Sequence, residues 1–172
     1  IDQVVQVYET DAIIQTKDNH SVRENEFYHI TDNFWKVFNL NFLKGLPFTG
    51  KQKHEIVISE KIAQKYFNSI DAVNKELIVN GEIKIVVGVY ETLTSATFNQ
   101  YDGLMPVSKE IDSYETGVFD CTTFILLHTK TLIEPFKTQL AKFDADTYQP
   151  LIEQFFDDSG FKVWHDFLPI AK

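Results

Sequence analysis

Residues 54–90 constrain the fold more than any other stretch, because they predict three consecutive elements with defined boundaries. An apolar, β-branched run at Glu55–Ile58 predicts a strand, and Ser59 directly after it is a favourable N-cap for a helix. Asn80-Gly81 separates two later apolar runs and predicts a hairpin with a type I′ turn, which needs positive φ at both central residues. Between them, apolar residues recur at helical spacing: Ile62, Ala63, Tyr66 and Phe67.

Outside this stretch the sequence alternates between strand-like and helix-like segments. Leu104-Met-Pro106-Val indicates the edge of a strand, and β-branched or aromatic runs predict further strands at Val4–Tyr8, Ala12–Gln15, Glu26–Ile30, Phe119–His128 and Phe161–Phe167. Three more helices are indicated: a short one capped by Thr31 or Asp32, one opened by a capping box at Thr131–Glu134, and one over Tyr148–Phe156. This mixed order predicts an α+β fold with a mixed sheet, not a doubly wound parallel fold.

Composition indicates one ordered domain and excludes several classes of partner. The chain has 172 residues, 44% of them apolar, with fifteen Phe, which is enough for a core without disulfides. A net charge of −9 and a single arginine, Arg23, argue against binding to nucleic acid or to anionic lipid. No apolar run reaches the ~18–20 residues of a membrane span. Because the chain begins at Ile1 in strand-like sequence, we expect a fragment or a processed product.

The residues give no catalytic, cofactor or metal site. The histidines are far apart in the sequence and show no metal-binding spacing: His20, His29, His54, His128 and His165. Neither a P-loop nor a Gly-rich nucleotide motif occurs, and Ser59 is better explained as a helix cap than as a nucleophile. The only cysteine, Cys121, lies in an apolar run and is predicted to be a buried structural thiol.

Aromatic residues crowd the fifteen positions from Phe34 to Phe48, more than one face of a short helix and strand would bury. Two interpretations are open. The rings can belong to the hydrophobic core, or Phe34, Trp35 and Phe48 can form a docking patch for a partner.

Three collinear segments resemble the MacB-like periplasmic core domain of bacterial ABC-transporter permeases of the FtsX type. They run from Phe34 to Phe48, from Glu55 to Phe67 and from Ile78 to Val89, and Leu104-Met-Pro106 and Phe124–Leu127 fit the strands that follow. The resemblance implies a single extracytoplasmic domain, 1–172. Within it, residues 1–48 plus 104–172 would form a porter-like subdomain, and residues 49–103 a smaller inserted subdomain.

The resemblance also implies a function without catalysis. Transmembrane helices would flank the domain, a cytoplasmic ABC ATPase would supply energy, and the periplasmic domain would convert it into movement. That movement would serve export, lipoprotein extraction or activation of a partner. The implied partners are the ATPase, a periplasmic adaptor or outer-membrane channel, and a second permease subunit.

The sequence leaves two other classes of protein open. A free-standing extracytoplasmic ligand-binding or adaptor module would have a concave, aromatic-lined pocket. An enzyme with an unrecognised site would bring titratable groups together in a cleft.

Overall fold

The structure is a computed structural model that describes residues 1–16, 18, 20–49, 52–93, 100–107 and 121–150. The chain divides into two units, Ile1–Leu126 and Leu127–Lys172. The predicted α+β class is confirmed, because the first unit combines a mixed sheet with helices α1 (Phe34–Val37) and α2 (Glu60–Phe67). Among the described residues, no helix is long and apolar enough to cross a membrane.

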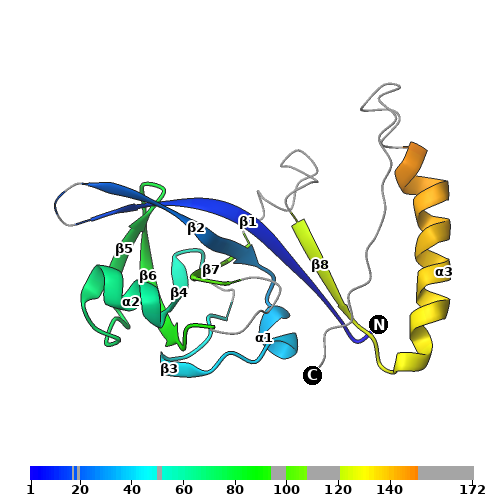
Figure 1. The fold of residues 1–172 in the computed structure, drawn as a ribbon, viewed down its shortest axis with the longest axis horizontal. Coiled ribbons are helices and arrows are strands. Elements are labelled where there is room, and N and C mark those ends of the chain that lie inside the picture. The colour runs from blue at the N-terminus through cyan, green and yellow to red at the C-terminus, as the bar shows by residue number, and fades with distance from the viewer. Residues whose placement is uncertain (17, 19, 50–51, 94–99, 108–120, 151–172) are drawn as a thin grey trace. The chain divides into compact units, whose positions relative to one another are not determined.

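Six strands of the first unit close into a barrel (Figure 1). Around the barrel they are β1 (Gln3–Gln15), β2 (Ser21–Ile30), β7 (Gly103–Pro106), β4 (Glu55–Ser59), β6 (Glu82–Tyr90) and β5 (Glu76–Val79), which pairs again with β1. The β2–β7 and β4–β6 pairs are parallel and the other pairs are antiparallel. Closure gives each barrel strand two neighbours, and β7 ends at Pro106, in the segment where the sequence indicates the edge of a strand.

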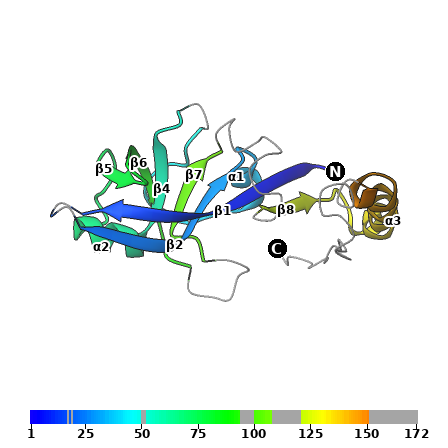
Figure 2. The same cartoon turned by 90° about the horizontal axis from the view of Figure 1, so that it is seen from above.

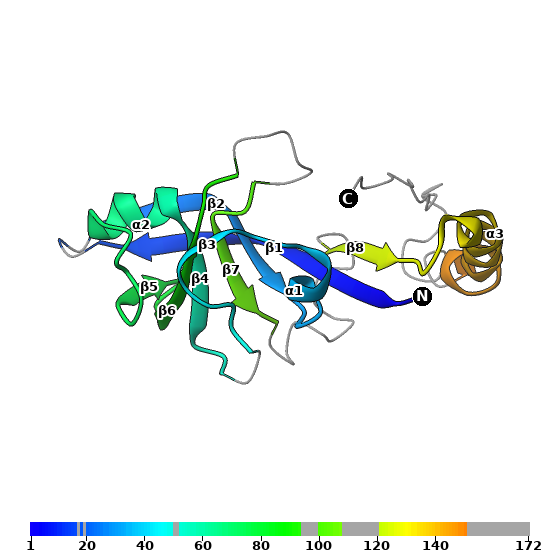
Figure 3. The ribbon, with the colours of Figure 1, turned by 90° about the horizontal axis from the view of Figure 1, so that it is seen from below.

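Two more strands extend this sheet. β8 (Cys121–Leu126) pairs with the N-terminal half of β1, and β3 (Phe42–Gly45) pairs with the end of β6. Figures 2 and 3 show β1 running from its pairing with β8 into the barrel. The two short runs predicted within residues 4–15 are thus one strand of 13 residues, because the polar stretch between them continues the ladder with β2.

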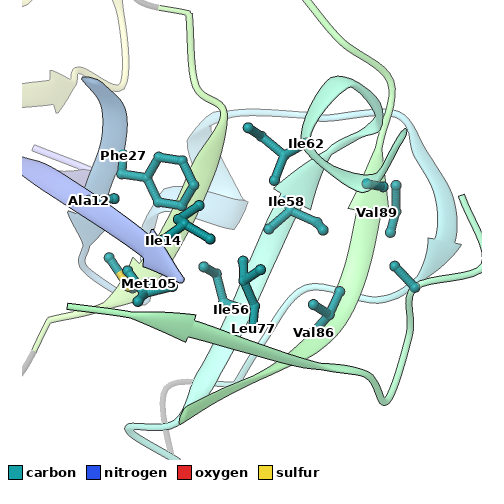
Figure 4. Close-up of a cluster of buried hydrophobic side chains, with 13 residues drawn as sticks. Ala12, Ile14, Phe27, Ile56, Ile58, Ile62, Leu77, Val86, Val89 and Met105 are labelled. Carbon is teal, nitrogen blue, oxygen red and sulfur yellow. The ribbon is translucent and has the colours of Figure 1, made fainter. Parts of the chain in front are cut away.

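Inward-facing aliphatic side chains fill the barrel and form its core (Figure 4). Side chains alternate between the two faces of a strand, so every second residue points into the barrel. These residues are Ala12 and Ile14 on β1, Ile56 and Ile58 on β4, and Leu77 and Val79 on β5. From α2, Ile62 and Ala63 complete this core, as their helical spacing predicts.

A second core lies on the other face of β1, where Val5 and Val7 are buried. It is rich in aromatic residues and collects side chains from α1, from the loop after β3 and from residue 101. Its buried members besides these valines are Tyr28, Ile30, Phe34, Phe48, Val57, Tyr90, Tyr101 and Leu104. β1 therefore contributes one face to each core.

The local signals in residues 54–90 are confirmed. The Ser59 hydroxyl accepts a hydrogen bond from the Ile62 N–H at 3.3 Å and caps α2. Asn80 and Gly81 have φ of 53° and 80°, as a type I′ turn requires. At α1 the prediction is wrong, because the N-cap is Asn33 and no side chain caps the helix. The Thr31 hydroxyl instead accepts the Gln6 N–H at 3.0 Å.

The described part of the second unit is helical. A 3₁₀ turn (Lys130–Leu132) leads into α3 (Ile133–Phe143), which continues as a π-helical turn (Asp144–Tyr148). The predicted capping box is wrong, because the 3₁₀ turn places Thr131 inside the helical run and the N-cap is Leu132. The remainder of the helix predicted over Tyr148–Phe156 and the strand predicted over Phe161–Phe167 lie outside the described residues.

The barrel combines strands from both predicted subdomains. β4, β5 and β6 come from residues 49–103, whereas β1 and β2 come from residues 1–48. The subdomain limits at 49 and 103 stay a prediction.

Candidate docking site

The three residues predicted as a docking patch do lie together. Their rings meet edge to face, with centroids 5.1 Å apart for Phe34 and Trp35 and 5.1 Å apart for Trp35 and Phe48. Phe34 is fully buried and Phe48 is 3% exposed, so these two rings belong to the second core. A docking role would require them to be exposed, which they are not. Trp35 is partly buried, and its indole Nε1 is buried without a hydrogen-bond partner.

The aromatic cluster combines rings that are neighbours in the chain with rings from distant segments. Phe34 at the start of α1 and Phe38, its C-cap residue, are one turn apart, and their ring centroids are 4.6 Å apart in a stacked pair. Phe38 also meets Phe124 of β8 edge to face at 4.9 Å, and Phe34 meets Tyr101 at 5.6 Å. Such aromatic pairs stabilise by about 0.5–1.5 kcal/mol each beyond the area that they bury.

A buried carboxylate fixes the start of α2 to β7. Asp102, directly before β7, is 4% exposed and accepts a hydrogen bond from the Ser59 hydroxyl at 2.9 Å. Its other oxygen pairs with the Lys61 ammonium at 2.5 Å. This contact raises the pKa of Lys61, chiefly through the hydrogen bond to Asp102.

A second carboxylate holds the next turn of α2. Glu24 of β2 is 9% exposed and accepts hydrogen bonds at 2.5 Å from both the Lys65 ammonium and the Tyr66 hydroxyl. Burial and this hydrogen bond raise the pKa of Tyr66 well above its usual value. Sequence reasoning missed both acceptors, because Asp102 and Glu24 lie about forty residues from their partners on α2.

Titratable groups also gather at the opposite end of the barrel, where β4 begins. Lys84 of β6 is 7% exposed and donates to the Glu82 carboxylate at 2.7 Å and to the Lys53 carbonyl at 3.2 Å. His29 of β2 places Nδ1 3.1 Å from the Pro106 carbonyl. Burial, and to a lesser degree the charge of Lys84, lower the pKa of His29.

The outer face of the barrel carries exposed apolar side chains. Ile83 of β6 is 52% exposed and Ile13 of β1 is 48% exposed. Both alternate with inward-facing residues, so period-two alternation could have identified them as outward. On β6, however, residues of both faces are apolar, so the sequence of that strand does not show which of them point outward.

The described residues bring together neither the sequence's histidines nor any other cluster of metal-binding side chains. Among them no three His, Cys, Asp or Glu side chains are placed to hold a metal ion. Ser59 is a helix cap with its hydroxyl committed to Asp102, as described above. Cys121 is partly exposed at the start of β8, so the predicted burial of its thiol is wrong. His165 lies outside the described part of the chain.

Comparison with solved structures identifies the fold as that of transporter ectodomains. The periplasmic region of MacB from Actinobacillus actinomycetemcomitans is 18% identical, with a TM-score of 0.64, over 94% of this chain and 78% of that one. The extracellular domain of the ABC-type transporter YknZ from Gram-positive bacteria is 17% identical, with a TM-score of 0.65, over 87% of this chain and 77% of that one. Comparison with curated proteins gives no significant match.

These likenesses concern the fold alone; the class, an extracytoplasmic domain of an ABC-type transporter permease, follows from the family that the sequence matches. The sequence itself matches the family described as MacB-like periplasmic core domain over residues 1–143. The chain belongs to that family, which confirms the resemblance read from residues 34–127.

Proposed function

We propose that this domain couples ATP hydrolysis in a cytoplasmic ABC ATPase to movement outside the membrane, without catalytic residues of its own. The movement would serve export, lipoprotein extraction or activation of a partner. The observation that carries the proposal is membership of the MacB-like family over residues 1–143, which assigns the chain to a transporter permease.

The internal construction of the barrel supports a mechanical role. A domain that transmits motion has to move as one body, which requires few soft joints between its elements. Here the barrel is closed, and α2 is fixed to it by Asp102 and Glu24 through four side-chain hydrogen bonds. One of these bonds is buried and the other three are partly buried, and charge-assisted bonds in such positions resist local opening more than fully exposed ones do.

The proposed partners follow from this role. The ATPase would act through membrane segments of the permease, and a second permease subunit would provide the opposing surface. A periplasmic adaptor or an outer-membrane channel would receive the movement.

Distance measurements on the full permease with its ATPase test the proposal. A nitroxide is attached at Gln64→Cys, an exposed position on α2, in a Cys121→Ser background. Electron spin resonance on the complex in lipid nanodiscs then measures the distance between labels on two permease subunits. We expect a change of at least about 5 Å between the nucleotide-free and the vanadate-trapped state, the size of a one-turn shift of one element past another at a subunit interface.

A second pair of labels checks that the barrel moves as one body. Gln15→Cys on β1 and Gln64→Cys on α2 are both exposed and both lie in the first unit. With labelled protein diluted in unlabelled protein, their distance is expected to stay constant in both nucleotide states. Unchanged distances between subunits, while ATP hydrolysis continues, would contradict the proposed coupling.

A further inference from the structure

Four isoleucines form an apolar patch on the outer face of three neighbouring barrel strands. We call this the isoleucine patch; it consists of Ile13 on β1, Ile78 on β5, and Ile83 and Ile85 on β6. Ile13 and Ile83 are about half exposed, and the other two are partly exposed. None of the four belongs to either hydrophobic core.

Strand register makes the patch continuous. Ile78 lies directly opposite Ile83 in the β5–β6 ladder, and Ile85 is two residues further along the same face of β6. On the other side of β5, the Asn80 N–H donates to the Ile13 carbonyl at 2.9 Å, which places Ile13 diagonally from Ile78. Diagonal neighbours on one face of a sheet are about 7–8 Å apart, within reach of aliphatic side chains.

Carboxylates flank this patch on both sides of β6. Ile85 lies across from Glu76 on β5 and across from Glu55 on β4. Glu76 is exposed, and one oxygen of Glu55, Oε2, is buried without a hydrogen-bond partner. A carboxylate oxygen left in this state is costly, so turning it toward a cation brought by a partner would be favourable.

The size and charge of the patch select its occupant. Four isoleucines at these exposures present on the order of 300 Å², below the roughly 800 Å² per partner of a stable protein interface. At the other end of the patch Arg23 lies opposite Ile13 but is already paired with Asp11. The patch of a second copy would therefore offer Glu55 and Glu76 no unpaired cation. An anionic lipid surface would be repelled by these carboxylates. A protein with an apolar centre and neighbouring Lys or Arg side chains fits both features.

We propose that the isoleucine patch docks a partner protein through aliphatic contact, with Glu55 and Glu76 pairing to basic residues around it. This inference rests on the proposed function, since it names the surface through which a moving domain would engage its partner. The patch would be the apolar centre of a larger interface.

Photocrosslinking in cells tests the surface with the full permease. p-Benzoylphenylalanine is introduced at position 83, and at position 4 as a control, because Val4 is 41% exposed on the opposite face of β1. We expect position 83 to give an adduct with a different protein, identified by mass spectrometry, and position 4 to give at most a fifth of that yield. The crosslinked peptide is expected to contain Lys or Arg beside apolar residues.

Charge variants show whether the adduct depends on the proposed pairing. Glu55→Gln with Glu76→Gln is expected to lower the yield at position 83 about threefold to tenfold, since each rim ion pair is weak. Asp32→Asn with Glu134→Gln removes the same charge elsewhere and should leave the yield unchanged. Glu76→Gln alone, at an exposed position, gives the same direction of effect if the double variant folds poorly.

Several outcomes would contradict the proposal that the isoleucine patch docks a partner protein. They are an adduct with a second permease copy, an adduct with lipid alone, equal yields at positions 83 and 4, or a yield insensitive to the two glutamates. If nucleotide-dependent distances between subunits still change, only the docking surface is wrong. If the adduct forms as expected and those distances stay constant, only the proposed coupling is wrong.

Discussion

The Ser59 hydroxyl donates to the Asp102 carboxylate at 2.9 Å while it accepts the Ile62 N–H at 3.3 Å. One fully buried side chain therefore caps α2 and ties it to the start of β7. The backbone N–H of Asp102 also donates to the Glu26 carbonyl of β2. Ser59 and Asp102 together therefore connect α2, β7 and β2. This junction joins elements that are far apart in the sequence.

Ser59→Ala should destabilise the chain by about 2 kcal/mol, because it removes a helix cap and leaves an Asp102 oxygen without its donor. Urea unfolding followed by circular dichroism measures this loss. Ser21→Ala, at an exposed position on β2, is the matched control and should change stability by less than about 0.5 kcal/mol. Equal effects of the two substitutions would mean that the junction contributes little.

Lys61→Met should also destabilise the chain, by about 1–2 kcal/mol, because it leaves a nearly buried Asp102 oxygen unpaired. Adding Asp102→Asn should recover part of that loss, since the amide carries no charge to compensate. A double-mutant cycle on unfolding free energies measures this coupling. Lys36→Met, at an exposed position of α1, is the control. Strict additivity of the two substitutions would contradict the ion pair's role.

Local chemistry accounts for what the sequence could predict. The Ser59 cap and the Asn80-Gly81 turn depend only on neighbouring residues, so the sequence is sufficient to predict them. The capping box predicted at Thr131 was wrong, because a 3₁₀ turn begins one residue earlier, at Lys130, and no local sequence signal predicts that turn.

Contacts between distant segments account for what could not be predicted. Asp102 and Glu24 are ordinary acidic residues in the sequence, and only barrel closure brings them to α2. The aromatic crowding from Phe34 to Phe48 allowed both a core and a docking surface. Burial of Phe34 and Phe48 depends on where α1 and the loop after β3 pack, which the sequence pattern leaves open.

Gly103→Ala should be strongly destabilising, because an added Cβ would lie 2.2 Å from the Phe27 ring, which packs on the glycine across the β2–β7 ladder. Overpacking of this kind costs about 1–3 kcal/mol. Phe27→Leu in the same chain should restore part of the stability by making room. Urea unfolding of the single and double variants measures the interaction. If Phe27→Leu adds its full cost to that of Gly103→Ala, the close approach is not the cause.

Acidification should destabilise the chain through His29. Burial between β2 and β7 and the nearby positive charge of Lys84 lower the pKa of His29. The hydrogen bond of His29 to the Pro106 carbonyl and the negative charge of Glu82 act in the opposite direction. The folded state therefore prefers neutral imidazole. Its contribution is intact above the unfolded pKa of about 6.5 and is lost as pH falls through that value toward the lower folded pKa.

Nuclear magnetic resonance titration and urea unfolding between pH 7.5 and 5 measure this effect of His29. The ring of His29 is expected to titrate below about 6.5, and Lys84→Gln should raise its pKa by removing the facing charge. His29→Gln should flatten the loss of stability toward low pH, because the group that takes up the proton on unfolding is gone. His20→Gln, at an exposed position, should leave that slope unchanged. A His29 that titrates at or above 6.5 would show that the fold does not disfavour its protonation.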